Sequence, residues 1–261
     1  MPARDLALLI QAARAAGEVV RPYFRNAPRQ WDKGGGAGPV TEADLAVNDR
    51  LEQVLRAARP DYGWLSEESP DTPARLSARR SFVIDPIDGT RAFIDGQDSF
   101  SHALAVVEDG RTVAAVVYLP IRDRLYAATI DGPATCNGAP IAPTAQDTTT
   151  GARILTGKPS LAAEHWQGAA LPAFQRAFRP SIAWRLCLVA EGRFDGALSF
   201  RAAWDWDIAA GCLIAERAGA TATAARGTPL RFNSATAQNA GLWVAPPALH
   251  ADLLSRMASV A

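Results

Sequence analysis

The stretch SFVIDPIDGTRAF, which runs from Ser81 to Phe93, joins an apolar segment to two aspartates that lie three positions apart. Its apolar part, FVI, predicts a buried β-strand. Asp85 and Asp88 stand at the end of that strand, where an unpaired carboxylate is costly unless a counter-ion or a metal neutralises it. The stretch therefore predicts a turn whose negative charges serve a chemical purpose.

Regular elements are predicted on both sides of this turn. Apolar residues recur at helical spacing over residues 5–25 and 41–60. Strand patterns follow between residues 81 and 141, with a hairpin signal at Asp109-Gly110. Further along the chain, strand and helix patterns alternate, which indicates a second α/β layer.

These elements predict an α/β fold in two parts. We expect an N-terminal α+β domain over residues 1–145, which carries the acidic motifs described below. A C-terminal α/β domain over residues 146–261 is expected to complete the active site.

The composition excludes several classes of partner. The 261 residues contain 27 basic and 27 acidic side chains, so no net field draws the chain to nucleic acid. No apolar run reaches the roughly 18 residues of a membrane span. The three cysteines match neither a disulfide framework nor a zinc site. We expect a cytoplasmic protein that acts on a small phosphorylated metabolite and binds neither a nucleic acid polymer nor a membrane.

Acidic residues occur in pairs at three places along the chain. The pairs are Glu67 with Glu68, Asp85 with Asp88, and Asp205 with Asp207. Each has an ordinary explanation as a solvated loop, a turn or a helix N-cap. Together they form an all-oxygen set without histidine or cysteine nearby, which favours a hard cation, Mg²⁺ before Mn²⁺ or Ca²⁺.

The spacing within DPIDGT excludes two other acidic sites. An EF-hand loop needs an oxygen ligand at its third position, where Ile87 stands. The Asp-x-Asp motif of the haloacid-dehalogenase phosphatases differs from Asp85-x-x-Asp88, so a covalent aspartyl phosphate is not supported. Gly89 and Thr90 would open a helix at RAFID, and the free N–H groups of a helix N-terminus bind anions.

Four motifs in order resemble those of the inositol monophosphatase superfamily of Mg²⁺-dependent, lithium-sensitive phosphatases. They are VTEAD at residues 40–44, SEES at 66–69, DPIDGT at 85–90 and WDIAAG at 206–211. The resemblance covers nearly the whole chain and implies a layered αβαβα sandwich. It also implies two to three Mg²⁺ ions in each active site, and either a monomer or a homodimer.

The resemblance implies a set of metal ligands. Glu67, Asp85 and the backbone carbonyl of Ile87 would bind a first metal ion. Asp85, Asp88 and Asp207 would bind a second, so that Asp85 bridges the two.

Catalytic roles follow from the same resemblance for Asp44, Glu67 and Thr90. Thr90 would pair with Asp44 and, together with Glu67, orient the attacking water. Thr41-x-x-Asp44 also matches a helix capping box, so Asp44 has a structural explanation as well. Phosphate is expected at Gly89 and Thr90, with Asp207 beside the leaving group.

The second half of the sequence bears on the substrate. RLCLVAEG, at residues 185–192, resembles a stretch of the bacterial 3'(2'),5'-bisphosphate nucleotidases, and Phe200 stands where inositol phosphatases carry a glutamate. We therefore expect 3'-phosphoadenosine 5'-phosphate first, and inositol 1-phosphate or another small sugar or polyol phosphate second. Arg185 would hold a second phosphate or lie on a helix surface. Asp205 would contact substrate or begin a helix with a favourable charge.

Three further points concern Lys33, the histidines and the possibility of a relative without catalysis. Lys33 resembles the lysine of the family's mobile metal loop, or belongs to an ordinary glycine-rich surface loop. The three histidines are expected to be structural or to lie on the surface; they are His102, His165 and His250. A regulatory relative that binds metal without turnover is the remaining alternative, and the complete acidic set argues against it.

Overall fold

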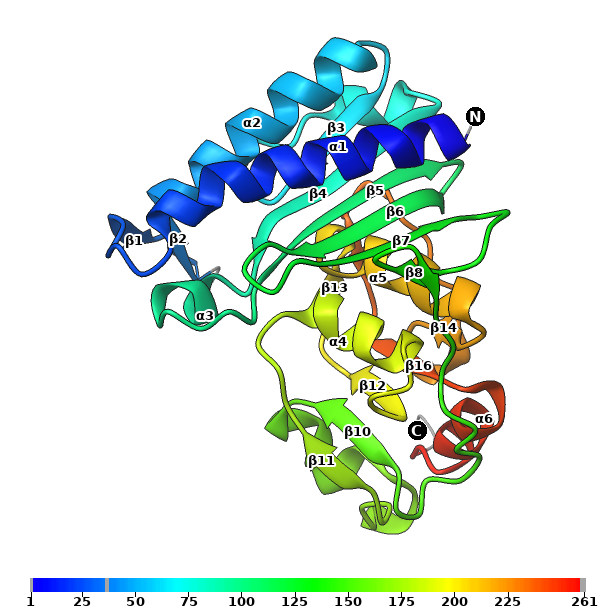
Figure 1. The fold of residues 1–261 in the computed structure, drawn as a ribbon. Helices are drawn as coiled ribbons and strands as arrows, with labels where there is room; N and C mark the ends of the chain where they lie inside the picture. The colour runs from blue at the N-terminus through cyan, green and yellow to red at the C-terminus, as the bar shows by residue number, and fades with distance from the viewer. Residues whose placement is uncertain (1, 36–37, 259–261) are drawn as a thin grey trace.

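The computed structural model describes residues 2–35 and 38–258, which form alternating layers of helices and sheets (Figure 1). The α-helices are α1 (Pro2–Val20), α2 (Glu42–Ala58), α3 (Thr90–Ile94), α4 (Ile182–Ala190), α5 (Asp205–Ala218) and α6 (Pro247–Ser255). Helices α1 and α2 cover one face of the large sheet, and α4 and α5 lie between the two main sheets. Helix α6 closes the far side, so the expected αβαβα sandwich is confirmed.

The large sheet has seven strands in sequence order. They are β3 (Gly63–Ser66), β4 (Arg80–Asp88), β5 (Ser101–Glu108), β6 (Arg111–Leu119), β7 (Arg124–Thr129), β8 (Thr135–Cys136) and β9 (Ala139–Pro140). All neighbours are antiparallel except β3 and β4, which are parallel. The hairpin predicted at Asp109-Gly110 joins β5 to β6.

The second sheet has five strands in the order β11-β10-β12-β16-β14. Their bounds are β10 (Arg153–Thr156), β11 (Gln175–Ala177), β12 (Gly196–Ser199), β14 (Thr221–Thr223) and β16 (Leu242–Ala245). Two short ribbons complete the strands: β1 (Gln30–Asp32) with β2 (Pro39–Thr41), and β13 (Ala203–Trp204) with β15 (Gln238–Asn239). The expected glycine-rich loop at residues 31–40 is thus partly a β-ribbon, and Gly36 and Ala37 lie outside the described residues.

The sequence of β5 explains why helices cover both faces of the large sheet. Successive side chains of a strand point to opposite faces. Ala103 and Ala105 pack in the cluster that includes α4 and α5, whereas Leu104 and Val106 pack in the cluster that includes α1 and α2. Because both faces are apolar, both must be covered.

The core between the two sheets joins the halves of the chain. That cluster contains Val117 of β6 and Ile214 of α5 together with Val244 of β16. The division at residue 145 therefore stays a prediction. Among the described helices, none combines the length and hydrophobicity that a membrane crossing requires.

Helices α4 and α5 approach closely at Gly211. A Cβ at this position would lie 2.7 Å from Leu186 Cδ1 and 3.1 Å from the carbonyl oxygen of Ala183. We expect Gly211→Ala to lower the free energy of unfolding by up to about 2 kcal/mol, since overpacking costs about 1–3 kcal/mol and helix propensity returns only about 1 kcal/mol. Urea denaturation measures this change.

Gly157→Ala is the matched control for Gly211→Ala. A Cβ at position 157 would meet no heavy atom closer than 3.5 Å, and the backbone φ of −77° suits any residue. Equal stability losses in the two variants would contradict the close packing of α4 on α5.

Candidate active site

The acidic motifs meet where β3 and β4 end. The two strands are parallel, with Ser66 paired to Ile84, so the residue after β3 lies beside the end of β4. The backbone N–H of Glu67 donates to the carbonyl oxygen of Ile84 at 3.1 Å. This pairing places the SEES motif beside Asp85 of the DPIDGT motif.

A third carboxylate comes from the first turn of α5. One ligand oxygen from each of Glu67, Asp85 and Asp207 lies within 4.8 Å of the other two. Carboxylate oxygens at this separation can share one hard divalent cation. Three of the five residues predicted to bind metal are therefore brought together.

The electrostatics of this group fit a bound cation. Asp85 is 1% exposed, and its Oδ1 has no hydrogen-bond partner among the described residues. Burial raises the pKa of Asp85 well above its usual value, and the charges of Glu67 and Asp88 raise it further. Burial and the charge of Asp88 raise the pKa of Asp207 in the same way. A divalent cation would relieve both the desolvation and the repulsion.

Asp88 has different partners from the other predicted ligands. It lies outside the close group of three, and its carboxylate accepts from Ser181 Oγ at 2.6 Å, Ile182 N at 3.1 Å and Ala183 N at 2.6 Å. These donors form the N-terminus of α4, where a negative charge is stabilised. Burial nevertheless raises the pKa of Asp88 to about 6. Its role as a metal ligand stays a prediction.

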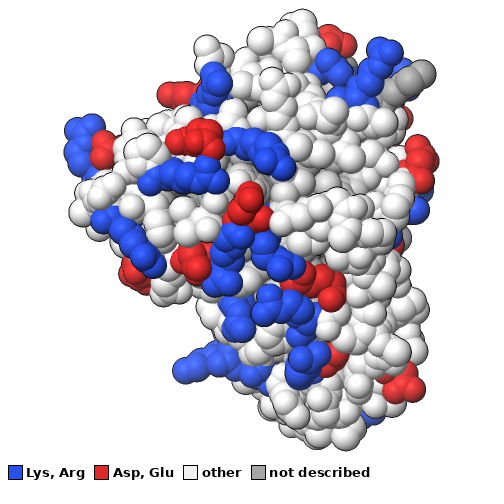
Figure 2. Space-filling model, in the orientation of Figure 1, with Lys and Arg blue, Asp and Glu red and all other residues white. Residues whose placement is uncertain are grey.

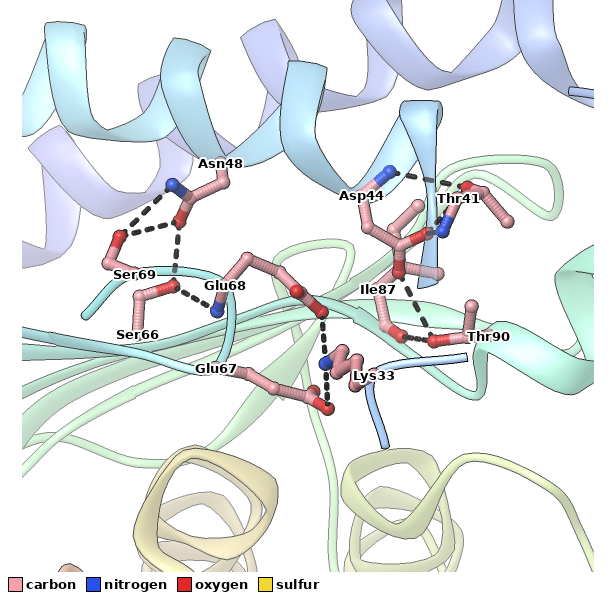
Figure 3. Close-up of polar contacts among 10 residues, drawn as sticks. All are labelled: Lys33, Thr41, Asp44, Asn48, Ser66, Glu67, Glu68, Ser69, Ile87 and Thr90. Carbon is pink, nitrogen blue, oxygen red and sulfur yellow. Dashed lines mark hydrogen bonds and ion pairs between the residues drawn. The ribbon is translucent and has the colours of Figure 1, made fainter. Parts of the chain in front are cut away.

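Asp44 makes both sets of contacts predicted for it (Figure 3). Its Oδ2 accepts from the backbone N–H of Thr41 at 2.8 Å, and the capping box at the start of α2 is complete. Thr90 Oγ1 lies 3.1 Å from Asp44 Oδ1 and 3.1 Å from the carbonyl oxygen of Ile87. Burial raises the pKa of Asp44, against the hydrogen bonds from Thr41. The structure thus links Asp44, Thr90 and Ile87 in one chain of polar contacts.

Lys33 lies between two of the predicted acids and is not a free surface residue. Its Nζ is 2.8 Å from Glu67 Oε1 and 2.6 Å from Glu68 Oε1 (Figure 3). Burial alone would lower the pKa of Lys33, but the two carboxylates outweigh it and raise that pKa. Burial raises the pKa of Glu68 to about 7. The ammonium group therefore shares Glu67 with the predicted metal site.

Gly89 occupies a backbone conformation that few other residues adopt. Its φ is 99°, and a Cβ there would lie 3.4 Å from the backbone nitrogen of Ser181. It precedes α3, which has only five residues, so this end supplies local N–H donors and little helix dipole. Gly89 and Thr90 both line the large cavity described next.

A cavity of about 1280 Å³ opens beside Glu67, Gly89 and Thr90. Its lining includes five arginines, namely Arg25, Arg91, Arg122, Arg179 and Arg201. Three carboxylates oppose them, and in the described part of the chain only Arg122 forms a salt bridge, to Asp98 at 2.6 Å. Figure 2 shows basic side chains running down this face from beside α3 towards β10 and β11. The lining is suited to an anion with more than one charge.

A sequence model of the inositol monophosphatase family matches residues 2–259. The chain belongs to this family. It is therefore a phosphatase, and the family assignment expected from the four motifs is confirmed. Members of the inositol monophosphatase family are metal-dependent, which agrees with the group formed by Glu67, Asp85 and Asp207.

Similar proteins in the family carry different names. The chain is 32% identical over 247 residues to an inositol-1-monophosphatase of Rhizobium meliloti (strain 1021), covering 90% of this chain and 91% of that protein. It is 29% identical over 227 residues to the 3'(2'),5'-bisphosphate nucleotidase CysQ of Escherichia coli O157:H7, covering 85% and 91%. The crystal structure of the extragenic suppressor protein suhB from Bartonella henselae superposes with a TM-score of 0.84, at 25% identity and 97% coverage of both chains.

The expected contact of Arg185 with a second phosphate stays a prediction. Arg185 is not among the residues that line the cavity. Its Nε donates to the carbonyl oxygen of Arg179 at 2.5 Å, and its Nη2 donates to that of Pro180 at 3.1 Å. Arg185 therefore holds the loop before α4, and the arginines of the cavity come from other segments.

Phe200 and Asp205 also have structural roles. Phe200 stacks on His165 with ring centroids 4.0 Å apart, in the aromatic cluster beneath α6, and does not line the cavity. Asp205 is fully buried and accepts from Asn233 N at 2.7 Å and from Asn239 Nδ2 at 2.9 Å. Neither residue is among those that line the cavity, and the bearing of Phe200 on the leaving group stays a prediction.

Two residues beside the acids carry roles that the motifs did not predict. Ser181 caps α4, accepting from Trp184 N at 3.0 Å, while its hydroxyl donates to Asp88. His102 Nδ1 lies 2.5 Å from the carbonyl oxygen of Pro86, and burial lowers the pKa of His102 to about 4, so the ring is neutral at pH 7. A serine directly before an apolar helix predicts an N-cap. The contacts of Ser181 with Asp88 and of His102 with Pro86 cannot be predicted from the neighbouring sequence, because the partners lie far away along the chain.

We expect Mg²⁺ to raise the melting temperature more at about pH 8 than at about pH 6. The raised pKa values of Asp85, Asp88 and Asp207 mean that the metal-free folded protein keeps protons that the unfolded chain has lost. That proton-dependent stability is fully present below the unfolded pKa of about 3.9 and is lost as the pH rises through the raised values. A bound cation replaces it.

Thermal denaturation in excess Mg²⁺ and in chelator, at both pH values, measures this effect. Asp85→Asn is the control and should respond little to Mg²⁺ at either pH. A Mg²⁺-induced shift in the wild-type protein that is equal at both pH values, or larger at the lower one, would contradict the electrostatic description.

Ser181→Ala tests the link between Asp88 and α4. The loss of an N-cap lowers stability by about 0.5–2 kcal/mol. We also expect kcat/KM to fall about 10- to 100-fold, since side chains that orient metal ligands typically contribute that much. Ser181→Thr keeps the hydroxyl and should restore activity. Full activity in Ser181→Ala would show that the contact with Asp88 does not position the acid.

Proposed function

We propose that the chain is an Mg²⁺-dependent, lithium-sensitive phosphomonoesterase whose substrate carries a second anionic group, with 3'-phosphoadenosine 5'-phosphate as the leading candidate. The observation that supports this is the cavity beside Glu67 and Thr90, with five arginines against three carboxylates. Four of those arginines form no salt bridge within the described residues. One phosphate can occupy the acidic end while the arginines receive another negative group.

Glu67, Asp85 and the carbonyl of Ile87 would hold one Mg²⁺, and Asp85, Asp88 and Asp207 would hold a second. The close approach of Glu67, Asp85 and Asp207 supports this pairing of sites. When bound, Mg²⁺ stabilises the charge of a transferring phosphoryl group and lowers the pKa of water. Oxygen-only ligands support Mg²⁺ over a softer metal, and one of them is a buried carboxylate oxygen without a hydrogen-bond partner in the described ranges.

The residues around Thr90 supply orientation and proton handling. Thr90 Oγ1 has one proton and lies at 3.1 Å from both Asp44 Oδ1 and the Ile87 carbonyl. When the hydroxyl donates to Asp44, its lone pairs accept a hydrogen bond from a water near Glu67 and so orient it. The N–H groups of Gly89 and Thr90 donate to phosphoryl oxygens, and Asp207 lies on the leaving-group side.

A second candidate substrate is inositol 1-phosphate. It is supported by the 32% identity to an inositol-1-monophosphatase along 90% of the chain. A cavity of about 1280 Å³ is large enough for either leaving group. Phe200 makes no contact with the cavity that would argue against inositol, whereas the arginine lining favours the bisphosphate.

A phosphate-release panel separates the candidates. We expect kcat/KM for 3'-phosphoadenosine 5'-phosphate to exceed that for inositol 1-phosphate and histidinol phosphate by at least about tenfold, because neither offers a second phosphate to the arginines. Fructose 1,6-bisphosphate carries two phosphates but no base, and it completes the panel. Asp85→Asn should reduce release by at least about 100-fold. Preference for inositol 1-phosphate would select the second candidate, and a lack of Mg²⁺-dependent release from every substrate would refute the catalytic assignment.

A further inference from the structure

Phe178 is an exposed aromatic residue inside the arginine-lined cavity. Its side chain is 47% exposed, and it lines the cavity beside Arg179. The only other aromatic residue in the described lining is Trp184, which is 3% exposed and lies under the guanidinium of Arg122 at 4.9 Å from its ring centroid. Phe178 is thus the one aromatic surface in the lining that is open to a ligand.

The ring of Phe178 is backed by Arg185. The guanidinium carbon of Arg185 lies 4.3 Å from the ring centroid, which is the distance of a stacked cation and arene. Arg185 is itself anchored through its hydrogen bonds to the carbonyl oxygens of Arg179 and Pro180. One face of the ring is therefore held by a fixed group, which limits the ordering cost of using the ring for binding.

The chain around Phe178 links this ring to the acidic site. Ser181, three residues later, donates to Asp88 at 2.6 Å. Arg179, the next residue, lines the cavity and forms no salt bridge with the described carboxylates. A flat apolar surface, a guanidinium without a described carboxylate partner and the N-cap serine that contacts Asp88 thus follow one another along a single short loop.

The geometry points to Phe178 as the platform on which a planar heteroaromatic leaving group, such as a purine, stacks while Arg179 faces its second phosphate. The assignment rests on the proposed function, since it names the part of the substrate that the cavity recognises. Arg185 acts as a positioning residue behind the ring. This explains how a cavity rich in arginine can distinguish a nucleotide from a compact polyol phosphate, which has no π-face.

Phe178→Ala tests the platform. We expect the KM for 3'-phosphoadenosine 5'-phosphate to rise about 10- to 100-fold with kcat changed little, because stacking of a base contributes to binding and takes no part in the chemical step. The KM for fructose 1,6-bisphosphate should stay within about twofold. Phe178→Trp, which keeps an aromatic face, should restore the wild-type KM. Leu171→Ala is the matched control, since Leu171 is 45% exposed and does not line the cavity.

Calorimetric titration measures the affinity for AMP and for ribose 5-phosphate, which is the probe without a base. It tests the stacking role of Phe178 independently of which substrate the enzyme hydrolyses. Tighter binding of AMP that is lost in Phe178→Ala supports the platform even if inositol 1-phosphate proves the better substrate. An unchanged KM and unchanged AMP affinity in Phe178→Ala would overturn it, and would leave a nucleotidase activity of the wild-type protein standing. Failure of the wild-type protein to bind AMP more tightly than ribose 5-phosphate would overturn it as well.

Discussion

The burial of like charges at the end of β4 is the constraint on which the rest of the site depends. Asp85 and Asp88 are 1% and 6% exposed, and Asp207 adds a third charge beside them. Such a group is stable only if each carboxylate is hydrogen-bonded, protonated or bound to a cation. The two aspartates of the loop differ in this respect. The N-terminus of α4 donates hydrogen bonds to Asp88, whereas one oxygen of Asp85 has no hydrogen-bond partner among the residues that the structure describes.

The layered architecture makes this arrangement possible. Helices cover both faces of the large sheet, so the ends of β3 and β4 are flanked by α2 on one side and by α4 and α5 on the other. The capping box of α2 presents Asp44, and the first turn of α5 presents Asp207. Helix termini, where backbone groups lack partners, thus surround the acidic loop and supply its polar contacts.

The sequence predicted the fold class and the family because local motifs carry both. It placed Glu67, Asp85 and Asp207 in one acidic set, and these three lie together in the structure. It missed the contacts of Ser181 and Lys33, because their partners come from segments far apart in the chain. The cavity arginines have the same origin: five separate segments contribute them, and no local pattern marks their convergence.

The bond between Ser181 and Asp88 spans 93 residues, and it joins the large sheet to the helix that packs on the second sheet. The acidic loop is therefore not a property of the first half of the chain alone. During synthesis, DPIDGT emerges long before the helix terminus that receives one of its charges. Assembly of the site is therefore a late event with a high loop-closure cost. A metal ion that binds there stabilises only the completely folded chain.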